Sequence, residues 1–174
     1  PVTATPACIN DAAAVSGGSS SGAAASIACD LAAGAIGSDT GGSVRIPAAW
    51  NDLVGLKTTA GRVSVQGVVP LCATFDTVGP LSKTVEDAAL LLAALEGRTP
   101  ADLTASSLRG KRLGILQTVA FDELRESPAK GFETALAKVI KAGAIVEDIE
   151  IKAVAKAMPL SPILFAAEAY GTWK

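Results

Sequence analysis

Two glycine- and serine-rich segments contain the residues that could do chemistry. Residues 17–22 read GGSSSG and residues 37–43 read GSDTGGS, and each has a serine directly after a pair of glycines. Glycine can adopt positive φ angles and lets other groups approach the backbone closely. A serine at such a position can be held exposed, with backbone N–H groups beside it. Acyl-transfer chemistry needs this combination, because the hydroxyl attacks a carbonyl carbon and the N–H groups stabilise the oxyanion.

Each segment taken alone has simpler interpretations. The first has the composition of a flexible linker, although an apolar, alanine-rich segment follows it at once. The second could be a plain turn or a phosphate-binding loop at a helix N-terminus. It lacks the Gly-Lys-Ser/Thr of a P-loop and the Gly-x-Gly-x-x-Gly fingerprint of dinucleotide-binding loops.

The absence of histidine restricts the possible mechanisms. The chain has no histidine at all, so a serine–histidine pair cannot form within it. A serine nucleophile would need another base, and a lysine held neutral by burial is the usual substitute.

Composition and charge narrow the class of protein. Of the 174 residues, 49% are hydrophobic and 18% are charged, which is enough apolar surface for a core and argues against disorder. The net charge of −2 does not indicate nucleic acid or an anionic membrane as a partner. No apolar run reaches the length of a membrane span, and no signal-peptide pattern is present. The 3 cysteines form no C-x-x-C pair, which predicts reduced thiols in a cytoplasmic protein and no metal site.

The elements that position the two loops can be predicted from hydrophobic periodicity and turn residues. Up to residue 67 the pattern predicts a helix over 23–33 with Ser20 or Ser21 as N-cap and a stop at Gly34, a short strand at 35–37 and a short helix from Ile46. Residues 54–57 are expected to form a short strand or an extended loop. Beyond residue 67 we expect a short strand or an extended loop at 68–71, a turn-rich segment at 75–80 and a helix over 84–95 with a Thr84–Asp87 capping box and a stop at Gly97.

The second half of the chain has the pattern of a strand–helix–strand unit. Residues 112–116 and 144–151 read as strands, and the helix between them is expected to begin at Ser127, an N-cap followed by Pro128. Such a unit normally makes a parallel strand pair. The tail over 154–174 is expected to be helical, with Pro159 and Pro162 interrupting it.

Together the two loops resemble the amidase signature family. The resemblance continues through 54–58, 61–64, 67–70, 76–80 and 84–89, so that residues 16–97 fit the family pattern. It implies an α/β fold with a mixed β-sheet flanked by helices, of which this chain would be a partial domain. Residues 1–174 are accordingly predicted to be part of a single domain, in which 16–97 form the core signature region and 98–174 its strand–helix–strand continuation.

The resemblance also implies a Ser–cis-Ser–Lys triad. Ser43 matches the nucleophile, and Ser19 matches the bridging serine, which follows a cis peptide bond. The backbone N–H groups around Thr40, Gly41 and Gly42 match the oxyanion hole and bind the substrate. The implied activity is hydrolysis of a small-molecule carboxamide through a serine acyl-enzyme, with release of ammonia or an amine and without a cofactor. Asp39 and Arg45 flank the second loop and are expected to brace it.

The third member of the triad is missing from the sequence. In the family the catalytic lysine lies upstream of the first loop, whereas this chain has no lysine before Lys57, which matches a different family position. We therefore expect the chain to be one piece of a longer polypeptide that lacks its N-terminal segment, and to be inactive in isolation. A homo-oligomer is possible for the whole protein.

Two other functions are compatible with the same residues. The chain could belong to the ammonia-supplying subunit of a tRNA-dependent amidotransferase, although the lack of a basic patch does not favour this. It could also be a non-catalytic binding domain of the same fold, for which the missing lysine is the support.

Overall fold

The computed structural model describes residues 6–174, which form two compact units. The first contains the described residues up to Asp102 together with Leu164–Lys174, and the second contains Leu103–Ile163. A short antiparallel hairpin of β1 (Ala7–Cys8) and β2 (Asp11–Val15) leads to the first glycine–serine loop. The prediction that 1–174 belong to a single domain stays a prediction.

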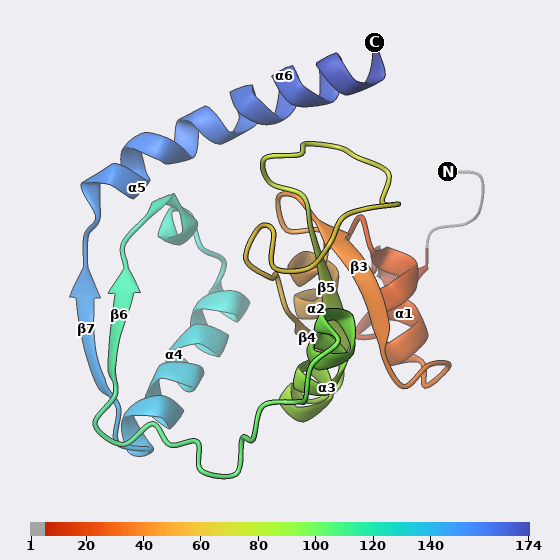
Figure 1. Ribbon diagram of the computed structural model, residues 1–174. Helices are drawn as coiled ribbons and strands as arrows, with labels where there is room; N and C mark the ends of the chain where they lie inside the picture. The colour runs from red at the N-terminus through yellow and green to blue at the C-terminus, as the bar shows by residue number, and fades with distance from the viewer. Residues whose placement is uncertain (1–5) are drawn as a thin grey trace. The chain divides into compact units, whose positions relative to one another are not determined.

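A three-stranded antiparallel sheet positions the second loop in the first unit (Figure 1). Its order is β3–β5–β4, so the central strand is paired on both sides, and every residue of that strand is buried. Gly37 and Gly79 lie directly opposite each other, and Asp39 opposite Thr77 forms the last pair. The strands are β3 (Ala35–Asp39), β4 (Val54–Gly55) and β5 (Thr77–Ser82).

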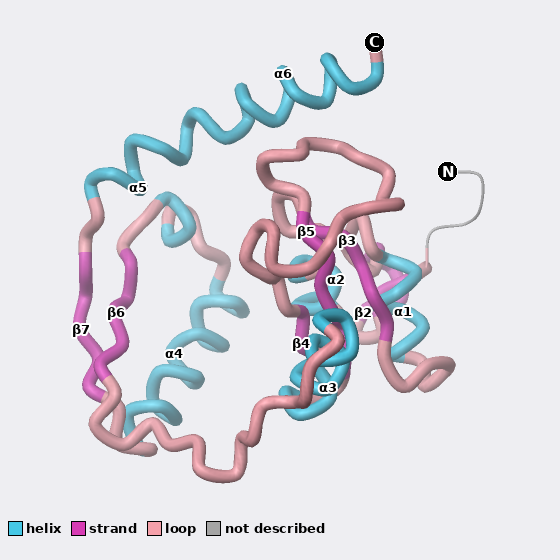
Figure 2. Tube along the Cα trace, viewed as in Figure 1, coloured by secondary structure: helices cyan, strands magenta, loops and turns pink. Residues whose placement is uncertain are grey.

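The prediction of a turn-rich segment at 75–80 is wrong for most of its length. Gly79 and Pro80 resemble turn residues, but both lie within β5. Pairing with two neighbouring strands overrides the local preference, since strand propensity depends mainly on burial and cross-strand contacts. Of the two alternatives left open for 68–71, a short strand or an extended loop, the loop is the one observed. Those residues lie in the long loop between β4 and β5, which is drawn in pink in Figure 2.

Helices cover this sheet and build the core of the unit. The buried core is a cluster of side chains from two helices and the central strand. Its members are Ala24 and Ile27 of α1, Val44 (the N-cap of α2), Ala48 of α2 and Leu81 of β5. The third helix packs against β5 and β4. These helices are α1 (Ser21–Ala28), α2 (Arg45–Trp50) and α3 (Val85–Glu96).

The first helix is shorter than the alanine-rich segment predicts. It ends at Ala28, because Asp30 takes a left-handed φ of 60° and turns the chain before Gly34 is reached. Ser20 is the N-cap residue as expected, but its side chain makes no capping hydrogen bond. Gly34 packs closely against Leu91 of α3 instead of ending α1.

The predicted ends of the third helix are confirmed. Thr84 is the N-cap, its Oγ1 accepts the N–H of Asp87 at 3.0 Å, and it donates to the Asp87 carboxylate at 2.8 Å. Gly97 ends the helix with a φ of 63°. The capping pattern in the sequence therefore identifies both ends, because each depends on a local interaction.

The second unit is the predicted strand–helix–strand motif. Its two strands pair in parallel, with Arg112 opposite Ile145, and the Arg112 side chain forms an ion pair with Glu147 at 2.7 Å. The helix begins at Glu126 with Arg125 as N-cap. The predicted N-cap, Ser127, is therefore wrong, because it already lies inside the helix. The elements are β6 (Arg112–Leu116), η1 (Val119–Phe121), α4 (Glu126–Lys141) and β7 (Ile145–Ile149).

The tail is helical, as predicted, and is interrupted at Pro159, whereas Pro162, also predicted to interrupt it, lies within the second of its helices. A 3-10 turn that contains Pro159 separates two helices. They are α5 (Lys152–Ala157) and α6 (Ser161–Trp173), with η2 (Met158–Leu160) between them. Mixed parallel and antiparallel pairing with flanking helices confirms the predicted α/β fold class.

Candidate active site

The first loop lies between β2 and α1 and contains an unusual peptide bond. The Gly18–Ser19 peptide is cis, which confirms the prediction made for this bond. The N–H of Ser20 donates to the carbonyl oxygen of Ser43 at 3.1 Å. This hydrogen bond joins the two glycine–serine loops directly, so Ser19 is adjacent to a residue that contacts Ser43. The Ser19 residue is exposed, and Ser43 is half-buried.

The second loop connects β3 to α2, and Ser43 is its last residue before the N-cap of that helix. Gly42 has a φ of 127°, a conformation that side chains with a Cβ rarely adopt. A Cβ at this position would also lie 2.7 Å from the Ile46 side chain. The chain direction immediately before Ser43 therefore depends on glycine.

The carboxylate of Asp39 holds this loop from within. The residue is completely buried, and its oxygens accept the N–H groups of Gly42 at 2.7 Å and Val44 at 3.2 Å. Arg45 donates to both carboxylate oxygens, from Nε at 3.0 Å and from the terminal nitrogen at 3.1 Å. The predicted bracing by Asp39 and Arg45 is confirmed by these contacts.

These hydrogen bonds determine the ionisation of Asp39. Burial alone would raise its pKa, because it removes water from the charged form. The hydrogen bonds from Arg45, from the backbone of Gly42 and Val44, and from Lys57 outweigh burial and hold the pKa well below its usual range. Asp39 is therefore a fixed negative charge under the second loop.

Lys57 braces the start of the same loop. Its Nζ donates to the carbonyl oxygens of Asp39, Thr40 (3.3 Å) and Phe75 (3.0 Å). It also lies 3.2 Å from the Asp39 carboxylate and 3.3 Å from Thr77 Oγ1. All these neighbours are oxygen acceptors, which makes Lys57 a donor that ties β3, the loop and β5 together.

Thr40 connects the loop to the segment before β5. Its Oγ1 donates to Asp76 Oδ1 at 2.5 Å, and both residues are buried. The other oxygen of Asp76 accepts the N–H groups of Leu71 at 2.8 Å and Cys72 at 3.0 Å. The second loop is therefore held by side chains from three parts of the chain.

The predicted site residues lie together in this region. Four of the five belong to the second loop, and Ser19 reaches it through the bond between Ser20 and Ser43. The N–H of Gly42 already donates to Asp39, so this N–H group is engaged and does not point to the predicted oxyanion hole. The five residues are Ser19, Thr40, Gly41, Gly42 and Ser43.

The comparison with protein families decides the affiliation of the chain. The family profile described as Amidase matches residues 2–174. The chain belongs to the amidase family. Among curated amidase relatives, a glutamyl-tRNA(Gln) amidotransferase subunit of Cereibacter sphaeroides is 40% identical over 170 residues, which is 88% of this chain and 34% of that protein. The corresponding protein of Caulobacter vibrioides is 39% identical over 166 residues, with the same coverage.

Solved amidase-family structures confirm the fold. The glutamyl-tRNA(Gln) amidotransferase subunit of Thermotoga maritima superposes with a TM-score of 0.88 at 30% identity, covering 96% of this chain and 40% of that one. The peptide amidase of Stenotrophomonas maltophilia gives 0.69 at 38% identity, covering 91% and 37%. This amidase chain thus spans about a third of the length of the curated relatives it matches.

Two bracing residues of this candidate site escape sequence reasoning. The sequence gives Lys57 no part in the site and places Asp76 in a turn, although both contact the second loop. No local signal marks Asp76, because its place next to Thr77, which pairs with Asp39, follows from the sheet. Cys72, predicted to be a small apolar residue, is buried, and burial raises the pKa of its thiol, with a further rise from Glu168.

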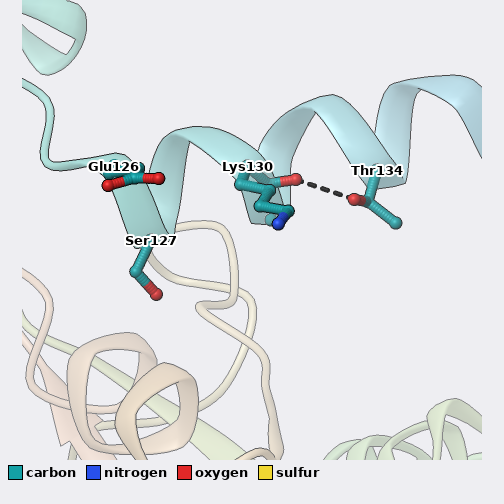
Figure 3. A pocket seen from close by; sticks show the side chains of 5 residues that line it. Glu126, Ser127, Lys130 and Thr134 are labelled. Carbon is teal, nitrogen blue, oxygen red and sulfur yellow. Dashed lines mark hydrogen bonds between the residues drawn. The ribbon is translucent and has the colours of Figure 1, made fainter.

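Other features of the described residues do not point to a second site. A hollow of about 520 Å³ is lined by Glu126, Ser127, Lys130, Gly131 and Thr134, all from α4 (Figure 3). The Thr134 hydroxyl in it donates to the Lys130 carbonyl at 2.8 Å. Over residues 6–174 we find no cluster of His, Cys, Asp and Glu that could hold a metal ion. Within the same range, no helix has the length and apolar character needed to span a membrane.

Proposed function

We propose that the chain provides the nucleophile of an enzyme that cleaves a carboxamide C–N bond, with Ser43 forming the acyl-enzyme. The observation that carries this proposal is the buried Asp39 carboxylate, which accepts N–H groups from the residues on both sides of Ser43. A serine between two anchored residues keeps its hydroxyl in one place, and nucleophilic catalysis depends on such positioning.

The proposed reaction has two halves. The Ser43 hydroxyl oxygen bonds to the substrate carbonyl carbon while its proton passes to Ser19, which gives its own proton to the base of the triad. The tetrahedral intermediate then collapses, the C–N bond breaks, and the leaving nitrogen takes a proton from the protonated base through Ser19. Water attacks the acyl-enzyme in the second half, which releases a carboxylic acid and restores the Ser43 hydroxyl.

The oxyanion would accept hydrogen bonds from backbone N–H groups of the second loop. Consecutive N–H groups in such a loop form a concave site for a negative charge. Because the Gly42 N–H already donates to Asp39, we assign the donors to Thr40, Gly41 and Ser43. Gly42 contributes its positive φ, which directs the neighbouring peptide groups. Loss of one oxyanion donor typically costs about 2.7–4 kcal/mol of barrier.

This assignment is tested with a fluorophosphonate probe on the full-length protein, followed by peptide mapping. We expect the probe to modify the peptide that contains Ser43, since the probe reacts with an activated serine and mimics the tetrahedral intermediate. Ser43→Ala should abolish the labelling. Modification of Ser19 or Cys72 in place of Ser43 would contradict the assignment.

The base of the triad would come from a part of the protein outside these residues. No lysine precedes Lys57 in the sequence. Lys57 is surrounded by oxygens under the loop, and Lys83 forms an exposed ion pair with Asp30. Neither arrangement places a lysine amine against Ser19, so we propose that another segment supplies it.

The location of the base is tested by assaying the isolated 174-residue chain on a simple carboxamide. We expect no Ser43-dependent turnover, because a serine hydroxyl without a base is a poor nucleophile. The full-length protein, or the chain supplied with the segment that carries the lysine, should be active. Clear turnover by the isolated chain that disappears in Ser43→Ala would place the base within it, and Lys57→Met and Lys83→Met would then identify which lysine serves.

A second candidate function is favoured by the names of the relatives. Those from Cereibacter sphaeroides and Caulobacter vibrioides are amidotransferase subunits, at 40% and 39% identity. In that role the same Ser43 chemistry would release ammonia from an amide for transfer to glutamyl-tRNA(Gln). Amide turnover that appears only when partner subunits are added would support this candidate. Turnover by the full-length protein alone would favour a self-sufficient amidase, and a protein whose Ser43 is never labelled would be a binding domain.

A further inference from the structure

We propose that Asp76 is a positioning residue for the Ser43 site and acts through the side chain of Thr40. This inference rests on the proposed function, since it concerns the loop whose N–H groups would bind the oxyanion. Asp76 is not part of the glycine–serine loops, and it follows the second loop by more than thirty positions in the sequence. The hydrogen bond from Thr40 Oγ1 to Asp76 Oδ1, at 2.5 Å, makes the connection.

The contact extends the β3–β5 ladder beyond its last backbone pair. Asp39 lies opposite Thr77, and Thr77 Oγ1 donates to the Asp39 carbonyl at 2.9 Å. One step further along each strand, Thr40 and Asp76 are joined by their side chains. Thr40 is thus fixed at the point where the chain leaves the sheet and enters the oxyanion loop.

Asp76 is itself fixed from its other side. Its Oδ2 accepts the N–H groups of Leu71 and Cys72, so one carboxylate ties Thr40 to the end of the β4–β5 loop. Both Thr40 and Asp76 are about 9% exposed, which limits competition from water. With three donors on its two oxygens, the carboxylate has little freedom to swing away from Thr40.

The C-terminal part of the first unit holds the end of the β4–β5 loop in place. The Glu168 carboxylate accepts from the N–H of Thr74 at 3.0 Å, from the Thr74 hydroxyl and from Cys72 Sγ at 3.3 Å. The indole N–H of Trp173 donates to the Pro70 carbonyl at 3.0 Å. The hydrogen bonds of Thr74 hold the pKa of Glu168 below its usual range. The segment 70–76 is therefore anchored at both ends, and Asp76 presents its carboxylate from a fixed position.

The consequence for the reaction follows from the precision that oxyanion stabilisation requires. Donors must lie about 2.7–3.1 Å from the place that the oxyanion will occupy. A displacement of about 1 Å can cost on the order of 100-fold in rate. The Thr40 hydroxyl donates its hydrogen to Asp76, so this bond acts by holding the backbone of 40–43.

The test measures amide turnover and the rate of Ser43 labelling by a fluorophosphonate in the full-length protein. The variants are Thr40→Val, Asp76→Asn, their combination, and Thr40→Ser, which keeps the hydroxyl. We expect Thr40→Val and Asp76→Asn each to lower kcat and the labelling rate by roughly 10- to 100-fold. KM should change by less than about two-fold, because the lost interaction acts on the transition state. The combination should lose no more than Asp76→Asn alone, since Asp76→Asn disturbs the Thr40 contact together with the Leu71 and Cys72 contacts, and Thr40→Val removes only the first of these. Thr40→Ser should restore most of the activity.

A matched control is available at the start of α3. Thr84 donates to Asp87 at 2.8 Å in a similar threonine–aspartate pair that does not contact either loop. Thr84→Val and Asp87→Asn should lower the melting temperature without changing kcat. If Asp76→Asn fails to fold, Thr40→Val with Thr40→Ser as its partner still decides the question, because it leaves Asp76 bonded to Leu71 and Cys72.

The outcomes separate this inference from the proposed function. Unchanged kcat and labelling in Thr40→Val, or losses that add in the combination, would overturn the role of Asp76 while Ser43-dependent turnover persists. Wild-type protein whose Ser43 is not labelled, or Ser43→Ala that keeps full turnover, would overturn the proposed function and this inference with it.

Discussion

Ser43→Ala is expected to lower kcat for amide hydrolysis by roughly 10⁶-fold, on the order of the loss seen when a serine nucleophile is removed from a hydrolase. The physical reason is that no other hydroxyl of the second loop stands between residues anchored by Asp39. The measurement is steady-state turnover of a simple carboxamide by the full-length variant, with its melting temperature recorded to show that the fold persists.

Ser19→Ala is the matched comparison for that result. Ser19 would move a proton and form no bond to the substrate, and proton transfer by a positioned group is worth roughly 10²–10⁴-fold. A residual rate well above that of Ser43→Ala is therefore expected. Equal and complete loss in both variants would leave their roles unseparated and contradict the prediction, and full activity in either one would refute the proposed mechanism.

Asp39→Asn is expected to have the largest effect on stability of any single substitution in the site. The change removes a fully buried negative charge that pairs with Arg45 and Lys57 and accepts two N–H groups of the loop. Removing one partner of a fully buried ion pair typically costs about 3–5 kcal/mol, and the half-exposed Arg45 side chain puts this pair at or below the lower end of that range. We expect a decrease of that order in the free energy of unfolding in urea, together with loss of turnover.

Acid unfolding gives an independent readout of the same carboxylate. The pKa of Asp39 is lower in the folded chain than in the unfolded chain, where it is near the ordinary value of about 3.9. Its contribution to stability is therefore present above that value and is lost as the pH falls through the lower, folded value. Asp39→Asn should remove this part of the acid dependence.

The control for Asp39 is the exposed ion pair of Asp30 with Lys83. Asp30→Asn should change the free energy of unfolding little, because exposed pairs contribute little to stability. Equal losses in Asp30→Asn and Asp39→Asn, or an Asp39→Asn protein as stable as the wild type, would show that the loop does not depend on the buried carboxylate.

Local sequence signals predict the elements whose ends depend on neighbouring residues. The third helix can be bounded because Thr84, Asp87 and Gly97 interact within one turn of their own positions. The two loops can be recognised because glycine and serine occur there in a pattern that few other structures require. The parallel pair of β6 and β7 follows from the strand–helix–strand order.

Elements that depend on distant residues cannot be predicted in the same way. The sequence of 77–82 contains glycine and proline and suggests a turn, because the strand character of β5 comes from β3 and β4 on either side. The bracing by Lys57 and Asp76 escapes prediction for the same reason. Their partners, Asp39 and Thr40, are brought to them by strand pairing, which no local pattern describes.

The facing glycines of β3 and β5 bear on how this member of the amidase family could be altered by directed evolution. A Cβ at Gly37 would lie 2.5 Å from Ser20 Oγ of the first loop, and a Cβ at Gly79 would lie 1.9 Å from the Leu56 carbonyl oxygen. Contacts this short would force the first loop, or the chain that leads into Lys57, away from the sheet. Libraries that seek new substrates should therefore keep both positions as glycine, and place their diversity in side chains that approach the site from outside the β3–β5 pair.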